Sequence, residues 1–477
     1  MGDVRESRKE KRFKKLRDAP KSPIPSSQPK IQKVPLMLRD HKNFDKYYVP
    51  RAVAIGPFHH GNPRCKLAQK YKRMLTSRFA EFVGQKEEDL YKKIEEKIKE
   101  LRECYVKEAT EHIDDDDLAW MLFLDGCSTL QFIYSLFHKH EEIEFKTDQV
   151  AFAQQDLFLL ENQIPYQVLE LLMSSSDKHE VLTQAIESFV QMHIIVRVKK
   201  QSKGQEQKHQ RGITENGEQK QEPDTTESTE HKVDITENTE TKQQGGLTTD
   251  TDQKQQPDVT TDANQKQQPE EPTHLLDLLR KRILGPPKKE VGEFSKQTFR
   301  NVQELSAAGI HFQPSETNFL GDISFKSHCF AGFLSLPPIS VDDSTGPKFM
   351  NLIAYEMCPD FQNDYGVTSY IGFLDALIDH ADDVKKLRSA SVLFNFLGSD
   401  KEVAKLFNEI GTDLVPNTAI YLSVKAELEK HYKTKWKTWM SQFCHDHFSS
   451  PWTILAFLGV LSALGLSGIQ TWYTVPS

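Results

Sequence analysis

Apolar residues recur at helical spacing in the first two hundred positions. Between positions 90 and 101 they follow at steps of four and three, with Lys and Glu between them, which predicts an amphipathic helix. A second helix is predicted at 118–137, because the acids at 114–117 favour the positive end of a helix dipole. Polar residues such as Asp125 interrupt this apolar stretch, which favours a buried core helix over a membrane span. Before both helices, the Pro- and aromatic-rich residues 34–63 predict an irregular packed segment.

Helical spacing returns after residue 272. The segments that carry it are 273–284, 300–309, 348–358, 367–411 and 417–448. We expect Gly309 to end the second of these, and Ser399 with Glu402 marks a helix start within the fourth. Among them, 319–341 alternates apolar and polar residues and has paired prolines, which predicts one or two short strands. The predicted fold class is mainly α, an α+β arrangement with a few short strands.

The composition changes abruptly between residues 201 and 272. Gln, Thr, Glu, Asp and Lys dominate, aromatic residues are absent, and TTDTDQKQQPD and TTDANQKQQPE are near copies. Ordering each residue costs roughly 1–2 kcal/mol of backbone entropy, and a segment with so few apolar side chains cannot offset that cost. We therefore predict a disordered low-complexity insertion that separates two halves of one helical domain, 31–200 and 273–448.

The last predicted helix differs from the others, because Pro451 to Tyr473 contains no charged residue. At about 1.5 Å of rise per residue, this length crosses a hydrocarbon core of about 30 Å. Tryptophans gather near its two ends, as they do at membrane–water interfaces. They are Trp436, Trp439, Trp452 and Trp472. We predict one transmembrane helix, and the alternative is a buried helix or hairpin of the soluble domain.

Charges beside this span predict its orientation. Lysines precede the span and no base follows it, so the positive-inside rule places the bulk of the chain in the cytosol. The lysines are Lys425, Lys430, Lys433, Lys435 and Lys437. The pattern is that of a single-pass tail anchor in the plasma membrane or endoplasmic reticulum. Gly459, Ala463 and Ser467 form either a helix-packing stripe or ordinary span composition, and Cys444 is either an acylation site or a plain thiol.

The composition indicates the cellular compartment of the protein but assigns no biochemical activity. A net charge of -8 is too mild to indicate nucleic acid, and 37% hydrophobic residues fit a chain of which one part never packs. The 6 cysteines form no C-x-x-C pair, which suits a reducing compartment. Residues 1–30 carry a basic cluster from Arg8 to Arg17 without a signal-peptide core. We expect a solvated flexible tail there, with a nuclear signal or an anionic-lipid contact as alternatives.

Candidate chemistry is sparse. His59 and His60 are neighbours, and neighbours in an extended stretch point in opposite directions, so a shared metal ion is not expected. Cys444 to His447 (CHDH) resembles a metal site in composition only, because zinc ligands need loops between them. The sequence has no G-x-S-x-G, H-E-x-x-H, Walker or Rossmann glycine motif. No catalytic, cofactor-binding or metal-binding residue is therefore assigned.

A polar trio interrupts the apolar run DLFLLENQIPYQVLELL. Glu161, Asn162 and Gln163 must find hydrogen-bond partners if they are buried, so capping and core hydrogen bonds are the first interpretation. The alternative is a membrane-tethered, hydrolase-like enzyme centred on His59, His60 or Glu161.

Several sequence blocks together resemble one plant family. They are, in order, VPLMLRDHKNFDKYYVPRAVAIGPFHHG, FLDGCSTL, QDLFLLENQIPYQVLE, ELSAAGIHF, NLIAYE and VTSYIGFLDALIDHADDVKKL. With the Pro-Trp pair ahead of the final apolar run, the chain is identified as a member of the plant domain-of-unknown-function 247 (DUF247) family. The resemblance covers Val34 to Tyr473 except the insertion. It implies an uncharacterised plant protein with a C-terminal transmembrane helix and supplies no catalytic residues. A few members have been linked to pollen–pistil self-recognition.

These observations predict a non-enzymatic interaction, signalling or recognition protein that is held at a membrane through Pro451 to Tyr473. Its expected partners are the lipid bilayer and one or more unidentified proteins, without nucleic acid or a cofactor. Tethering would raise the effective concentration of such partners at the surface. A nuclear role for the basic N-terminus would require that this tail outcompete the membrane anchor.

Overall fold

The computed structural model describes most of the chain outside the predicted insertion. The described residues are 8–18, 29–138, 146–174, 176–194, 271–286, 300–328, 331–412, 414–433 and 451–474. The predicted disordered insertion at 201–272 lies outside them, except for its last two residues. Met1–Lys199 and Glu271–Ser477 fall in one compact unit, so both halves of the sequence contribute to the same body.

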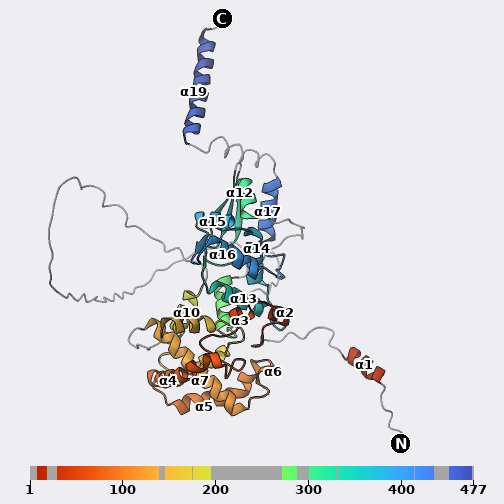
Figure 1. The fold of residues 1–477 in the computed structure, drawn as a ribbon, viewed down its shortest axis with the longest axis vertical. Helices are drawn as coiled ribbons and strands as arrows, with labels where there is room; N and C mark the ends of the chain where they lie inside the picture. Colours follow the sequence, from red (N-terminus) through yellow and green to blue (C-terminus); the bar gives the residue numbers. More distant parts are fainter. Residues whose placement is uncertain are drawn as a thin grey trace, which may run out of the picture. The chain divides into compact units, whose positions relative to one another are not determined.

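In the first half, α4, α5, α9 and α10 pack against the long helix α7 (Figure 1). The helices of this half are α1 (Arg8–Arg17), α2 (Leu36–Arg39), α3 (Phe44–Tyr48), η1 (Pro63–Cys65), α4 (Lys66–Val83), α5 (Glu87–Glu103), α6 (Lys107–Thr110), α7 (Asp115–Phe137), α8 (Thr147–Asp156), α9 (Tyr166–Met173) and α10 (His179–Met192). The side chain of Asp114 accepts a hydrogen bond from the backbone N–H of Asp117 at 2.8 Å and caps α7. The predicted helices at 90–101 and 118–137 are confirmed as α5 and α7, and α7 is largely buried.

The second half is also mainly helical. Its helices are α11 (Leu275–Leu284), α12 (Val302–Ala307), α13 (Thr345–Glu356), α14 (Gly366–Leu377), α15 (Ala381–Ser389), α16 (Asp400–Ile410), α17 (Leu422–Lys433) and α19 (Pro451–Thr474). Gly309 follows α12 with φ +79°, and Ser399 caps α16, both as predicted. The predicted helix at 417–448 is present as α17, and residues 434–448 lie outside the described ones.

Five short strands accompany these helices in the described residues. They are β1 (Ile310–Pro314), β2 (Ser324–Ser327), β3 (Gly332–Leu336), β4 (Ile339–Val341) and β5 (Leu393–Asn395). One sheet has the order β1-β3-β2, with β1 parallel and β2 antiparallel to β3. The other pairs β4 with β5 in parallel. The mainly α fold class with a few short strands is therefore confirmed.

The strand prediction was incomplete in two places. The segment 319–341 contains three strands, not one or two. In addition, β1 follows the predicted helix stop at Gly309, and β5 lies within the predicted helical segment 367–411. β5 has only three residues, and it forms because Ile339 to Val341 of β4 lie beside it. Strand formation depends on a partner that is distant in the sequence, so a short segment gives little local signal.

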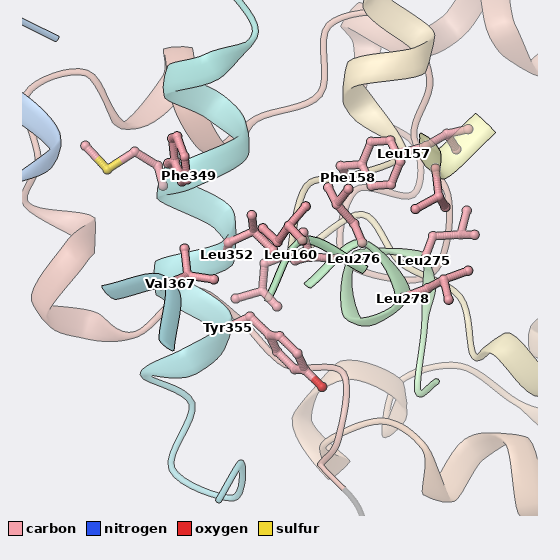
Figure 2. Packing of buried hydrophobic residues seen from close by; sticks show 14 of the residues in the cluster. Leu157, Phe158, Leu160, Leu275, Leu276, Leu278, Phe349, Leu352, Tyr355 and Val367 are labelled. Atoms are coloured by element: carbon pink, nitrogen blue, oxygen red, sulfur yellow. The ribbon is translucent and has the colours of Figure 1, made fainter. Parts of the chain in front are cut away.

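The two halves share one hydrophobic core. Figure 2 shows buried side chains from three separate parts of the chain gathered between α11 and α13. They include Leu157, Phe158 and Leu160 from the segment after α8, Leu275, Leu276 and Leu278 from α11, and Phe349, Leu352 and Tyr355 from α13. Since neither half buries these side chains alone, the core requires both.

Candidate functional site

Helix α19 exposes an apolar surface. The stretch Leu455–Trp472 has no buried residue, and it contains no Asp, Glu, Lys or Arg. Its length and composition suffice to cross a membrane. The hydroxyl of Ser462 donates to the Leu458 carbonyl at 2.8 Å, and that of Thr471 donates to the Ser467 carbonyl at 2.8 Å. These bonds lower the cost of placing a hydroxyl in lipid.

The residues that precede α19 are described only in part. Lys425, Lys430 and Lys433 lie on α17, where Lys433 forms an ion pair with Glu429 at 2.7 Å. The other residues singled out here from the sequence lie outside the described part of the chain. They are Lys435, Trp436, Lys437, Trp439 and Cys444 to His447.

A cluster of buried polar side chains holds residues 51–56, which form neither helix nor strand. The carboxylate of Asp156, at the end of α8, accepts hydrogen bonds from the backbone N–H groups of Arg51, Ala52 and Val53 at 2.6 to 3.1 Å. Burial raises the pKa of Asp156 to about 6, while these N–H groups act in the opposite direction. One carboxylate thus satisfies three backbone donors.

Asn162 continues this pairing along the same segment. Its Oδ1 accepts from the backbone N–H of Ile55 at 2.8 Å. Its Nδ2 donates to the carbonyls of Val53 at 3.0 Å and Asp156 at 2.9 Å. The amide therefore uses both its acceptor and its donors on backbone groups that would otherwise be buried without partners.

Asp125 and Lys72 hold the far end of the segment. The carboxylate of Asp125 accepts from the backbone N–H of Gly56 at 2.8 Å and pairs with the ammonium of Lys72. Lys72 also donates to the carbonyl of Ala54 at 2.5 Å. Both charged side chains are almost fully buried, and each is compensated by the other. Asp125, the acid that interrupts the apolar surface of α7, thus forms a structural ion pair with Lys72.

The side chain of Gln163 also bonds to backbone groups, but outside residues 51–56. Its Nε2 donates to the carbonyls of Leu157 and Leu159, both at 2.8 Å, and its Oε1 accepts from the backbone N–H of Leu276 at 3.3 Å. The core hydrogen bonds predicted for Asn162 and Gln163 are therefore present. The last of them joins the first half of the sequence to α11.

The structure brings Glu161 and His59 together and places His60 on the surface. Glu161 Oε2 lies 3.6 Å from His59 Nε2. Its Oε1 accepts from the backbone N–H of Val34 at 2.8 Å and lies 3.5 Å from the Arg39 guanidinium. The alternative enzyme site was predicted at His59, His60 or Glu161. Of these three residues, the structure pairs His59 with Glu161.

The electrostatics of this pair favour a neutral histidine. Burial, with a smaller contribution from the charge of Lys33, lowers the pKa of His59 to about 4. Burial also raises the pKa of Glu161, against the stabilising Val34 N–H. In the described part of the chain, the hydrogen-bond and ion-pair partners of the two side chains include no serine, threonine or cysteine. The arrangement therefore lacks a nucleophile next to the histidine.

One group of potential metal ligands lies at the start of α15. Oxygen or nitrogen atoms of Asp379, His380 and Asp383 lie within 4.8 Å of one another. However, the Asp383 carboxylate already accepts from the backbone N–H groups of Gln303, Asp379 and His380 at 3.0 to 3.1 Å. These bonds cap the helix, and they explain the cluster without a metal ion.

A pocket of about 170 Å³ lies between residues 51–53 and the helices α4, α7 and α8. Its wall is mainly apolar and includes the rings of Tyr71, Phe132 and Phe152. No sequence feature indicated this pocket, because residues from four separate segments form its wall. No motif or periodic pattern marks such a set in advance.

Comparison with known proteins agrees with the sequence blocks. A family model, DUF247, described as a plant protein of unknown function, matches residues 31–466. The UPF0481 protein At3g47200 of Arabidopsis thaliana is 24% identical over 466 residues, which is 89% of this chain and 82% of that protein. A second UPF0481 protein of Arabidopsis thaliana, At3g02645, is 23% identical over 467 residues, 89% of this chain and 86% of that protein. No solved structure matches the chain.

Proposed function

This chain belongs to the DUF247 family of plant proteins, and we propose that it is a membrane-anchored protein that acts through protein partners. The observation that supports this most is the exposed, uncharged helix α19. In water, an apolar surface of this length would be costly to expose, whereas a bilayer of about 30 Å would solvate it. The proposed span is Pro451 to Tyr473.

The charge distribution supports a cytosolic location for the bulk of the chain. Lysines at five positions from 425 to 437 precede the proposed span. Positive charges favour the cytosolic side of a membrane. The plasma membrane and the endoplasmic reticulum both meet these conditions.

An interaction role fits the rest of the molecule better than catalysis. The buried polar side chains around residues 51–56 are saturated by backbone groups, as structural side chains are. The alternative, a hydrolase-like enzyme centred on His59, His60 or Glu161, would need a nucleophile and an open site. Glu161 is 9% exposed, and His60 lies on the surface.

The experiment that tests the anchor places two charges at the middle of α19. Full-length protein with Leu461→Arg and Leu464→Arg is compared with the matched variant that carries alanine at both positions. An arginine near the centre of a span costs about 3 kcal/mol, so two should prevent insertion. We expect the wild type and the alanine variant to stay in membranes after alkaline carbonate extraction, and the arginine variant to be released.

The same variants test the role of the anchor in partner binding. Proteins that co-purify with the wild type from membranes should be lost with the arginine variant and kept with the alanine variant. Release of the wild type by carbonate would contradict the anchor. An identical set of partners for all three proteins would contradict the proposed role of tethering.

A further inference from the structure

The pocket beside residues 51–53 has the construction of a ligand site. Its wall is mostly apolar, with Leu67, Tyr71, Phe132, Val150 and Phe152 among the lining residues. Among the described residues, no Asp or Glu lines it, although acids outnumber bases in the whole chain. Three bases line it instead: Arg51, Arg64 and Lys72. Small-molecule sites commonly combine an apolar cavity with a few polar groups that fix the ligand's orientation.

Two of these bases already have carboxylate partners. Lys72 is paired with Asp125 and also donates to a backbone carbonyl. The guanidinium of Arg64 lies 3.1 Å from the carboxylate of Asp45. Neither base therefore brings an uncompensated positive charge to the pocket.

Arg51 is different. Its guanidinium donates to the backbone carbonyl of Lys46 at 3.2 Å and lies 5.1 Å from the centre of the Phe152 ring. In the part of the chain that the structure describes, no carboxylate lies within 4.0 Å of it as an ion-pair partner. Its remaining N–H groups are available to a planar anion at the pocket.

We propose that this pocket binds a small aromatic carboxylate, with its ring against Tyr71, Phe132 and Phe152 and its carboxylate on Arg51. Arg51 has no ion-pair partner within 4.0 Å among the described residues, and its charge partly offsets the burial that raises the pKa of Asp156. One arginine without a direct ion pair matches one negative charge, which favours a carboxylate over a phosphate. The volume of about 170 Å³ sets the size of the ring. A cavity of about 150 Å³ in another protein accommodates benzene, so this one suits one ring and a small substituent.

This inference is independent of the membrane anchor. It concerns a site built from the first half of the chain, whereas α19 lies at its end. Because residues 51–53 line the pocket and their backbone groups bond to Asp156 and Asn162, ligand binding would act directly on this polar cluster.

The test measures binding of 4-fluorobenzoate to full-length protein in lipid nanodiscs by fluorine NMR. The neutral analogue 4-fluorobenzamide has nearly the same shape and no charge. We expect the carboxylate to bind at least tenfold more tightly than the amide, because the amide carbonyl can still accept from Arg51 but carries no negative charge. Empty nanodiscs report the binding by lipid alone.

Three variants assign the binding to the pocket. Arg51→Gln should weaken binding of the carboxylate at least tenfold and leave binding of the amide unchanged. Ala153→Phe should fill the cavity and abolish binding of both compounds. Arg73→Gln removes an exposed base of α4 that does not line the pocket and should change neither. A thermal unfolding curve for each variant shows that it is folded.

The proposal is overturned if the wild type binds no more 4-fluorobenzoate than empty nanodiscs do. Equal affinity for the carboxylate and the amide would also overturn it. So would a folded Arg51→Gln variant that binds the carboxylate as tightly as the wild type, because the charge assigned to Arg51 would then play no part.

Discussion

Several buried polar side chains of this protein bond to the backbone of a different segment. Glu356 on α13 is fully buried and accepts from the backbone N–H groups of Val367 and Thr368 at 3.0 and 2.8 Å. It also pairs with Arg280 of α11 at 2.7 Å. The start of a helix and an arginine both stabilise a buried carboxylate, so this residue joins α11, α13 and α14.

His274 is a buried side chain that bonds to the backbone of its own helix. It is fully buried, and its Nδ1 accepts from the backbone N–H of Asp277 at 3.1 Å, which caps α11. Its ring contacts that of Tyr355 with a centroid distance of 4.8 Å. Burial lowers the pKa of His274 to about 4, with Asp277 acting in the opposite direction. Because Nδ1 must accept a hydrogen bond, protonation would remove the cap.

Replacing His274 by asparagine should reduce the acid sensitivity of the protein. The unfolded chain takes up a proton near pH 6.5, whereas the folded chain resists protonation down to about pH 4. The stability that depends on the neutral ring is therefore complete above pH 6.5 and is lost as the pH falls. At pH 5 this loss amounts to about 2 kcal/mol. Asparagine also caps helices but does not titrate.

The measurement is the free energy of unfolding of the full-length protein in detergent at pH 7 and pH 5. The difference between the two pH values should be about 2 kcal/mol smaller for His274→Asn than for the wild type. His112→Asn is the matched control, since the side chain of His112 is 86% exposed. Equal differences in all three proteins would contradict the role assigned to His274.

At the scale of elements, residues 51–56 form no strand, and buried side chains bond to their backbone N–H groups instead of a neighbouring strand. The segment ends at Gly56, whose φ is +69°. A Cβ atom there would lie 2.5 Å from the carbonyl oxygen of Gln163, which is closer than such atoms approach. Tyr105 donates to the same carbonyl at 3.2 Å. Glycine is therefore required here for backbone conformation and for space.

Gly56→Ala should lower the free energy of unfolding by about 3 kcal/mol, from the unfavourable φ and the steric overlap together. Gly84→Ala is the matched control, because Gly84 has φ +65° and nothing within 4 Å of its Cβ position. It should lose only about 1 kcal/mol. Chemical denaturation of both variants measures the difference. Equal losses would show that residues 51–56 do not approach Gln163 as closely as the structure indicates.

At the scale of the whole molecule, one asparagine joins the two sequence halves. Asn351 on α13 is fully buried, and its Oδ1 accepts from the backbone N–H of Leu160 at 2.8 Å. Its Nδ2 donates to the carbonyls of Tyr47 and Pro347 at 2.7 and 2.8 Å. Leu160 and Tyr47 belong to the first half, and Asn351 and Pro347 to the second. Since the core is also shared, we expect both halves to unfold together.

Asn351→Ala should therefore accelerate the slowest amide exchange in both halves by the same factor. Leaving these backbone groups unpaired costs about 3 kcal/mol, which corresponds to roughly a hundredfold in the opening equilibrium. Hydrogen-exchange mass spectrometry of α9 and α14 reports one element from each half. Faster exchange in α14 alone would contradict a common unfolding unit.

The control is another asparagine, whose contacts stay within the second half: Asn301 Nδ2 donates to the Asp379 carboxylate at 3.0 Å. Asn301 caps α12 by accepting from the backbone N–H of Glu304 at 2.9 Å. Asn301→Ala loses one helix cap, which costs about 1 kcal/mol, so it should accelerate the slowest exchange in α9 and α14 only about fivefold.

Local pattern was enough to predict α5, α7, the stop after α12 and the start of α16, but it led to no prediction of α4, which spans Lys66–Val83. The apolar spacing of α5 and α7, the Ser399 cap and the stop at Gly309 all depend on residues within one or two turns of each other. The apolar length of α19 is also a property of consecutive residues. The sequence alone therefore determined the mainly helical class and the presence of a C-terminal helix able to span a membrane.

Tertiary structure decided what depends on distant partners. Asn162 and Gln163 were expected to form hydrogen bonds, but only the fold shows that the partners of Asn162 include Ile55 and those of Gln163 include Leu276. Strand β5 exists because β4 pairs with it, and the pocket beside Arg51 exists because four segments meet there. The physical reason is the same in each case. Pairing and enclosure are properties of residues that meet in space, and their positions along the chain do not specify which residues meet.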